Sequence, residues 1–203
     1  MKNPFLETKL IARSEPSSEI LVADCIKKGG VCVVPTDTVY GFSGIVPQSQ
    51  SHIHSIKGRD EGKPFIQLIA KPEDLYCYTD VIIPQQLFSL WPGAVTVIVP
   101  VTQDDGEKTT VAFRCPGDSW LRKVIDLVDA PIYSTSVNRS GEPVLGNVEA
   151  IYQEFSGEVE LIVGGDEIID PNAKPSTLVE LFSNGKCKIL RQGSVVIPPE
   201  LLA

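Results

Sequence analysis

The chain has 203 residues, of which 42% are hydrophobic and 22% are charged, so a wholly disordered protein is excluded. That length allows one large domain or two small ones, each with a proper core. The formal net charge of −8 argues against a general nucleic-acid binder, whose surface is usually basic, but it leaves room for a local basic pocket.

The first predicted element is an amphipathic helix over residues 17–28. Ser17 or Ser18 would cap it, and its apolar side would carry Ile20, Leu21, Ala23 and Ile26. Two glycines end this helix before a buried strand. The elements that follow are a strand (31–34), a helix (49–59), a second strand (65–70) and two short helices (71–78 and 84–91).

The second half of the chain contains a predicted β-hairpin. Its strands are residues 94–101 and 109–116, and a polar turn joins them. A helix follows over residues 119–129. Four strands come after it, over residues 130–136, 159–165, 176–181 and 187–193. Because the hairpin interrupts strict alternation, we expect an α/β fold in which helices flank one twisted, mixed parallel and antiparallel sheet. Residues 1–203 would form a single domain, with residues 198–203 as a tail.

The five cysteines form no CxxC pair, and the two histidines have no cysteine close by, so we expect no metal site of the zinc type. The N-terminal residues lack the apolar core of a signal peptide, and no segment reaches the roughly 18 apolar residues of a membrane span. We therefore expect a cytoplasmic protein with no membrane partner, whose cysteines are mostly free and buried.

Polar residues follow the first predicted strand directly, at Thr36, Asp37, Thr38 and Tyr40. These residue types suit a turn. They also suit a binding edge, because open α/β sheets bind ligands beyond the carboxyl ends of their strands. The residues alone leave both interpretations open.

Three cations, Lys57, Arg59 and Lys63, lie close together in an acidic chain. One interpretation is a solvated loop in which Asp60 and Glu61 are the partners. The other is a phosphate clamp, because arginine offers a planar fork and lysine a mobile point charge. The spacing does not match a Walker loop.

Further polar residues are expected at strand ends. Thr110 and Arg114 share a face of their strand because they are four residues apart. No GxSxG elbow is present, so a serine hydrolase is not supported. The other candidates are Ser134, Thr135, Ser136, Asn138, Ser140, Ser176, Thr177 and Arg191.

Seven segments in this order resemble the YrdC-type threonylcarbamoyl-adenylate synthases in their short, single-domain form. The segments are PTDTVYG, KGR with KP, WPGAVT, VAFRCP, STSVNRSGEP, PSTLVE and LRQG, and the resemblance spans about residues 18–195. It implies a nucleotidyltransferase that condenses L-threonine, bicarbonate and ATP to threonylcarbamoyl-AMP and pyrophosphate. A separate transferase complex would then modify tRNA.

The resemblance also implies roles for particular residues. The threonine side would hold Thr36, Arg114, Ser134 and Ser176. The catalytic cations would be Lys57, Arg59 and Lys63, with Mg²⁺ expected to arrive with ATP. ATP would lie against Arg59, Lys63, Thr110, Ser136, Asn138, the backbone of Val144, and Arg191.

Two departures from the family pattern stand out. Leu68 occupies the place of a histidine in long members, and two acids follow Arg59 where a proline is common. Two alternatives stay open. One is a carbamoyl-adenylate former like the homologous domain of hydrogenase-maturation proteins. The other is a double-stranded RNA-binding module. A weak direct contact with tRNA or double-stranded RNA also stays open.

Overall fold

The computed structural model describes residues 5–58, 64–103, 105–165 and 173–203. Its strands form one ten-stranded sheet in the order β1-β8-β2-β3-β7-β4-β6-β5-β9-β10. Parallel pairs such as β5–β9 and antiparallel pairs such as β5–β6 both occur, which confirms the predicted mixed sheet flanked by helices. The strands are β1 (Lys9–Ala12), β2 (Cys32–Val34), β3 (Gly41–Ile45), β4 (Ile66–Leu68), β5 (Val95–Thr102), β6 (Lys108–Arg114), β7 (Ile132–Ser136), β8 (Leu161–Gly164), β9 (Thr177–Leu181) and β10 (Cys187–Arg191).

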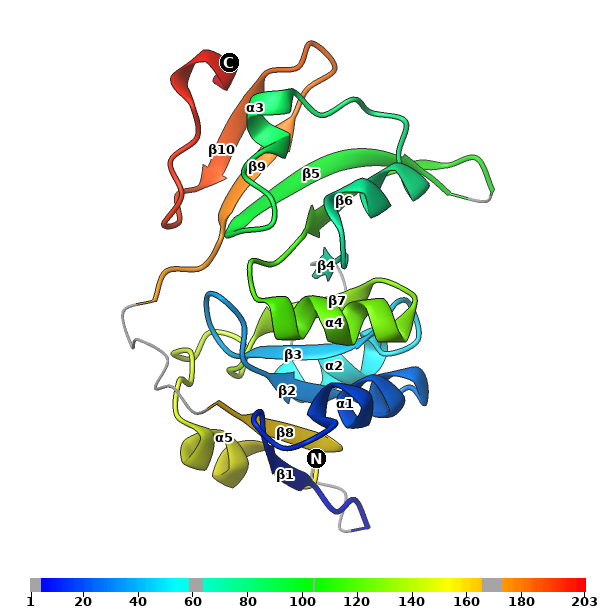
Figure 1. Cartoon of the computed structure of the whole chain (residues 1–203), viewed down its shortest axis with the longest axis vertical. Helices are drawn as coiled ribbons and strands as arrows, with labels where there is room; N and C mark the ends of the chain where they lie inside the picture. The colour runs from blue at the N-terminus through cyan, green and yellow to red at the C-terminus, as the bar shows by residue number, and fades with distance from the viewer. Residues whose placement is uncertain (1–4, 59–63, 104, 166–172) are drawn as a thin grey trace.

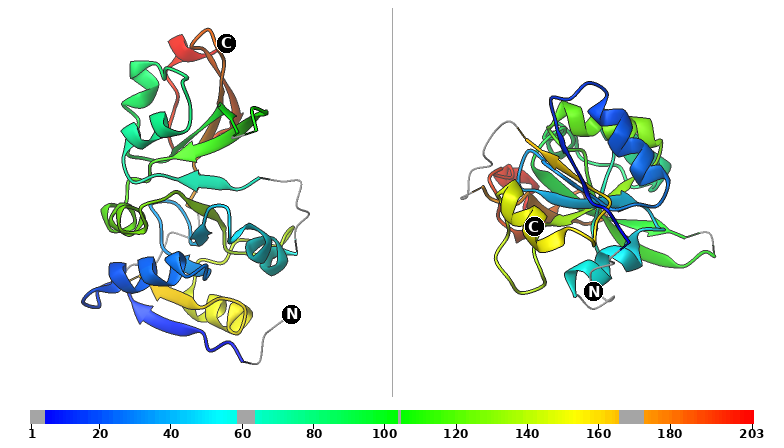
Figure 2. Two further views of the ribbon diagram at one scale, coloured as in Figure 1. Left: turned by 90° about the vertical axis from the view of Figure 1, so that its right-hand side faces the viewer. Right: turned by 90° about the horizontal axis from the view of Figure 1, so that it is seen from below.

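Helices cover both faces of the half of the sheet that contains β8, β2, β3 and β7. Helices α1 and α4 lie on one face, and α2 and α5 lie on the other (Figures 1 and 2). Each face has its own apolar cluster, around Ile26 and Leu121 on the first and around Phe42 and Phe155 on the second. The α-helices are α1 (Ser18–Lys27), α2 (Gln50–Lys57), α3 (Gln85–Phe88), α4 (Ser119–Val128) and α5 (Val148–Phe155), and the 3₁₀ helices are η1 (Pro72–Cys77) and η2 (Pro199–Leu201).

The other half of the sheet, made of β6, β5, β9 and β10, is covered on one face. Val97 and Val179 pack there against Leu75 of η1 and near Leu87 of α3. The opposite face carries the partly buried side chains of Ile98, Ala112 and Leu178, which line a pocket. This half therefore supplies a core on one side and a wall of the pocket on the other.

The two halves meet at β4, which is only three residues long. It pairs antiparallel with β7 and parallel with β6. The edge strands β1 and β10 lie at opposite ends of the molecule (Figure 1). The pocket lies where the halves face each other, so its walls come from both.

Two local expectations were wrong. Helix α1 buries Val22, Ala23 and Ile26, whereas Ile20 and Leu21 are half-exposed. Val22 and Ile26, which are four residues apart and so lie on the same side of the helix, therefore define the face of α1 that packs against α4. The C-terminal segment is not a free tail, because Leu201 is buried in the core and the Ala203 N–H donates to the Cys187 carbonyl at 3.0 Å.

Among the described residues, no helix combines the length and the apolar character that crossing a membrane requires. All five cysteines are free.

Candidate active site

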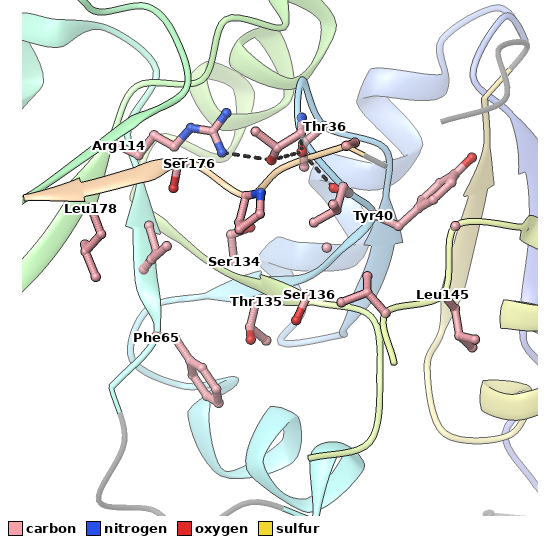
Figure 3. Close-up of a pocket in the computed structure, with 18 of the residues that line it drawn as sticks. Thr36, Tyr40, Phe65, Arg114, Ser134, Thr135, Ser136, Leu145, Ser176 and Leu178 are labelled. Carbon is pink, nitrogen blue, oxygen red and sulfur yellow. Dashed lines mark hydrogen bonds between the residues drawn. The ribbon is translucent and has the colours of Figure 1, made fainter. Parts of the chain in front are cut away.

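A pocket of about 1340 Å³ opens between the two halves of the sheet. Small-molecule pockets usually measure about 300–1,000 Å³, so this one has room for a nucleotide and a second substrate together. Hydroxyl groups and two guanidinium groups alternate along its wall with apolar side chains. Figure 3 shows Arg114 and Ser176 toward one end, Leu145 toward the other, and Ser134, Thr135 and Ser136 between them.

Arg114 is the buried cation of the pocket and stands at the end of β6. Its Nε donates to the Gly93 carbonyl at 3.0 Å and its Nη1 to Thr38 Oγ1 at 3.1 Å. Its Nη2 forms an ion pair with Asp37. Burial lowers the pKa of Arg114, and the neighbouring Asp37 carboxylate opposes that shift. The guanidinium is thus fixed by three partners, one of which carries the opposite charge.

Thr36 and Thr38 fold the segment after β2 into a fixed turn. Thr36 Oγ1 donates to the Val39 carbonyl at 2.7 Å and accepts from the Thr38 N–H at 3.0 Å. Thr36 and Thr38 also line the pocket. The segment is therefore an ST-type turn that also forms part of the pocket wall, and the binding-edge interpretation stays a prediction.

Strand β7 contributes Ser134, Thr135 and Ser136 to the pocket. A Cβ added to Gly41 of the neighbouring strand β3 would lie 3.0 Å from Ser134 Oγ, so glycine there leaves room for the serine hydroxyl. Ser136 Oγ donates to Asn138 Oδ1 at 2.8 Å. The polar row along β7 is thus an ordered set of donors and acceptors.

Ser176 and Arg191 form the opposite wall. Ser176 Oγ lies 2.7 Å from Thr96 Oγ1, and the Nε and Nη2 of Arg191 donate to the Ser176 carbonyl at 3.1 and 3.0 Å. Burial lowers the pKa of Arg191, and the charge of Arg114 lowers it further. Two guanidinium groups close enough to repel each other favour an anion between them.

Lys57 does not line the pocket although it belongs to the predicted cation cluster. Its buried ammonium donates to the Ser136 carbonyl at 2.6 Å and to the backbone and side-chain oxygens of Asn138 at 3.0 and 2.9 Å. Asn138 also stays outside the pocket lining and reaches Ser136 beneath it. These two residues therefore support the pocket wall from behind.

The remaining predicted residues divide into three groups. Arg59 and Lys63 lie outside the described residues, although Pro64, the next residue along, lines the pocket. Val144 lines the pocket and is half-exposed. Thr110 is not among the lining residues. It lies on the same face of β6 as Ala112, and Ala112 does line the pocket.

Some features of the site went unrecognised in the sequence. Asp37 was seen only as one member of the polar stretch after the strand, and its partner Arg114 lies 77 positions away, so no local pattern could join them. The apolar walls formed by Phe65, Leu145 and Leu178 have no signature that separates them from core residues. Helix α5, which follows the Val144 segment, was not predicted either.

In the described part of the chain, no three side chains of the His, Cys, Asp and Glu types are grouped as a metal site would need. Leu68 is buried in the core cluster, is the register partner of Arg114 across β4 and β6, and is not among the residues that line the pocket.

A mixed α/β sheet whose halves enclose two guanidinium groups and a row of hydroxyls has the chemistry that suits a small anionic ligand. A family model named for Sua5, YciO and YrdC, and described as "Telomere recombination", matches residues 24–193. The chain belongs to this family, which confirms the resemblance drawn from the seven segments.

The chain is 29% identical to human threonylcarbamoyl-AMP synthase over 180 residues, which cover 83% of this chain and 64% of that protein. It thus spans less than two thirds of the human protein's length. Sua5 of P. abyssi, solved in complex with L-threonine, is 28% identical with a TM-score of 0.79, over 93% of this chain and 58% of that one. E. coli YciO shares the fold at 22% identity and a TM-score of 0.77, over 96% of this chain and 99% of the other.

Proposed function

We propose that this protein is an L-threonylcarbamoyladenylate synthase that uses L-threonine, bicarbonate and ATP. The observation that carries the proposal is the buried Arg114, which is fixed on three sides and borders a pocket large enough for a nucleotide. An amino-acid carboxylate is the natural partner of such a guanidinium. The complex of P. abyssi Sua5 with L-threonine supports threonine as that amino acid.

The proposed reaction has two chemical steps. The threonine amine adds to bicarbonate and water leaves, which gives a carbamate. A carbamate oxygen then attacks the α-phosphorus of ATP, and pyrophosphate leaves. Both reactants of the second step are anions, so catalysis rests on holding them together and offsetting their charges.

Each wall of the pocket has a part in this scheme. Arg114, Thr36, Ser134 and Ser176, which all line the pocket, would hold threonine. Ser136, Val144 and Arg191 would border the nucleotide. Arg59 and Lys63 remain proposed phosphate ligands next to Pro64, and Lys57 with Asn138 would keep the Ser136 wall in place.

Magnesium would enter as part of the MgATP substrate. The described residues that line the pocket offer hydroxyls and one carboxylate, Glu149. This set suits a metal ion that is held mainly by ATP better than one that is bound by protein ligands alone. Mg²⁺ usually keeps several waters and binds through substrate phosphates. The product would pass to a transferase that modifies tRNA. The five free cysteines support a reducing compartment, which we propose is the cytoplasm.

The direct test is pyrophosphate release from ATP, with threonine and bicarbonate omitted in turn. We expect release only when both are present, and mass spectrometry should find threonylcarbamoyl-AMP. Release with carbamoyl phosphate in place of both would assign the protein to carbamoyl-adenylate formation instead. Absence of release under all conditions would reject both enzyme assignments.

A further inference from the structure

Asp37 stands at a junction of three segments behind the pocket wall. It lies between Thr36 and Thr38, which both line the pocket, but it is not itself a lining residue. One carboxylate oxygen pairs with Arg114 Nη2, and the other accepts the Gly117 N–H at 2.8 Å. The two oxygens of one side chain thus join the turn after β2 to the end of β6 and to the segment before α4.

The three partners of Arg114 fix its orientation. A guanidinium carries five N–H donors. The described residues accept three of them, one each from Nε, Nη1 and Nη2. One donor on Nη1 and one on Nη2 remain, which is the number that a bidentate carboxylate needs. Loss of the Asp37 contact would free the plane of the guanidinium to rotate.

Asp37 also balances the charge of Arg114. The Arg114 side chain is 6% exposed and that of Asp37 is 20% exposed, so the pair is poorly solvated. A buried cation whose partner has been removed is strongly disfavoured. Asp37 therefore holds the charge in place before any ligand arrives.

Gly117 leaves the space that the Asp37 carboxylate occupies. A Cβ at this position would lie 2.9 Å from Asp37 Oδ2 and 3.6 Å from Gly93 Cα. Gly93 is itself the residue whose carbonyl accepts from Arg114 Nε. Replacing Gly117 by alanine would thus displace the Asp37 carboxylate without removing any charge.

We propose that Asp37 is a positioning residue that presents Arg114 to a substrate carboxylate without touching the substrate. The identification of this carboxylate as that of threonine rests on the proposed function above. Asp37 differs in this role from Thr36 and Thr38, its pocket-lining neighbours. Gly117 also gains a role in substrate affinity, although that residue lies outside the pocket lining.

The first experiment compares Asp37→Ala and Asp37→Asn with the wild type in the pyrophosphate assay. We expect the KM for threonine to rise ten- to a hundredfold, while kcat and the KM for ATP change less than threefold. Asparagine should restore little, because its neutral amide has one acceptor oxygen, whereas Arg114 and Gly117 donate to two different oxygens of Asp37. A rise in the KM for ATP of equal size would mean general damage to the site and would overturn the proposal.

The second experiment is a double-mutant cycle with Arg114→Ala, read as L-threonine binding by isothermal titration calorimetry. If Asp37 acts through Arg114, Asp37→Ala combined with Arg114→Ala should bind threonine no more weakly than Arg114→Ala alone. Additive losses would overturn the proposal, because they would mean that Asp37 acts on its own.

Gly117→Ala provides a second test in case the Asp37 variants do not fold, because it displaces the Asp37 carboxylate and leaves the residue itself unchanged. Gly164→Ala is its matched control. Gly164 meets nothing within 3.5 Å of an added Cβ, the nearest atom being the Ile11 carbonyl oxygen at 3.6 Å. We expect Gly117→Ala to weaken threonine binding at least fivefold and Gly164→Ala to leave it within twofold. Equal affinity in both would overturn the proposal.

Because binding is measured without turnover, the two proposals fail separately. Threonine binding that depends on Arg114 and Asp37, without pyrophosphate release, would reject the synthase activity and retain the role of Asp37. Threonine binding that is indifferent to Arg114→Ala would overturn the role of Asp37 even in an active synthase.

Discussion

The ammonium of Lys57 holds Asn138, which lies 81 positions further along the chain, through two hydrogen bonds of 3.0 and 2.9 Å. A third bond of 2.6 Å reaches the Ser136 carbonyl. One side chain at the end of α2 therefore fixes the segment that follows β7. Since Ser136 lines the pocket, this contact connects the stability of the fold to the shape of the site.

Lys57→Ala should destabilise the protein by about 2–3 kcal/mol, because the buried oxygens of Ser136 and Asn138 lose their donor. The loosened wall should also raise the KM for ATP. Urea unfolding and the pyrophosphate assay measure the two effects. Lys71→Ala is the control, because Lys71 pairs with Asp126 on the surface, where solvent screening leaves an ion pair with little effect on stability. Equal effects of the two substitutions would contradict this account.

Arg59→Ala should leave a folded protein with ATP use weakened about ten- to a hundredfold. The reason is the loss of one charged donor to phosphate, worth about 1.5–3 kcal/mol. Arg59→Lys should recover only part, because lysine lacks the planar fork. The same variants should be titrated with double-stranded RNA. Unchanged pyrophosphate release together with a large loss of RNA affinity would favour the RNA-binding alternative.

Serine should replace threonine poorly but measurably. A single methyl group in a pocket discriminates by about 1–3 kcal/mol, which is roughly ten- to two-hundredfold. The measurement is kcat/KM for pyrophosphate release with each amino acid at saturating ATP and bicarbonate. Equal efficiencies would count against threonine as the substrate.

Gly193→Ala should disrupt the wall that holds Arg191. A Cβ there would lie 2.2 Å from the Pro175 carbonyl oxygen and 2.5 Å from the Thr177 nitrogen, both backbone atoms that cannot turn aside. Overpacking of this kind costs about 1–3 kcal/mol. We expect a lower melting temperature and weaker ATP use, whereas Gly164→Ala, whose Cβ would make only ordinary van der Waals contacts, should change neither.

Stability should fall as the pH rises above 9. Burial raises the pKa of the Cys115 thiol to about 12, from an ordinary value of 9.0. Burial also raises the pKa of Cys187, Tyr78 and Tyr133. These groups ionise first in the unfolded chain, so their contribution is complete below pH 9 and is lost between about pH 9 and 12.

Urea unfolding at several pH values under reducing conditions would show this decline. Cys115→Ala should flatten it, because that substitution removes the thiol whose pKa is raised to about 12. A free energy of unfolding that rises from pH 9 to about pH 10.5 would contradict the prediction.

The sequence indicated those elements whose apolar pattern is local. The hairpin of β5 and β6 and the helix over residues 119–129 were predicted within a residue or two, because alternation and helical spacing are visible in short windows. Strand β3 was missed, since its sequence GFSGI carries two glycines, which usually weaken a strand. Strand β1 was also missed, because it is four residues long and is held by β8, far away in the sequence.

The site was predictable as a set of residue types but not as an arrangement. Thr36, Ser134, Ser136, Ser176, Arg114 and Arg191 all line the pocket, as strand ends with polar residues suggested. The inward turn of Lys57 could not be foreseen, because a lysine in a charged loop is normally solvated. Its burial depends on oxygens from β7, which only the folded chain supplies.

The strand order of the sheet has a consequence for how the protein folds. Strand β2 pairs with β8 through Cys32 and Leu161, and β5 pairs with β9 through Val95 and Thr177, so long stretches of chain must close before these parallel pairs can form. Such distant pairings slow folding, because the entropy of closing the loop is lost before any contact repays it. Arg114, Ser176 and Thr36 meet only once both halves of the sheet are complete. On refolding, helical circular dichroism should therefore return before the ability to bind threonine.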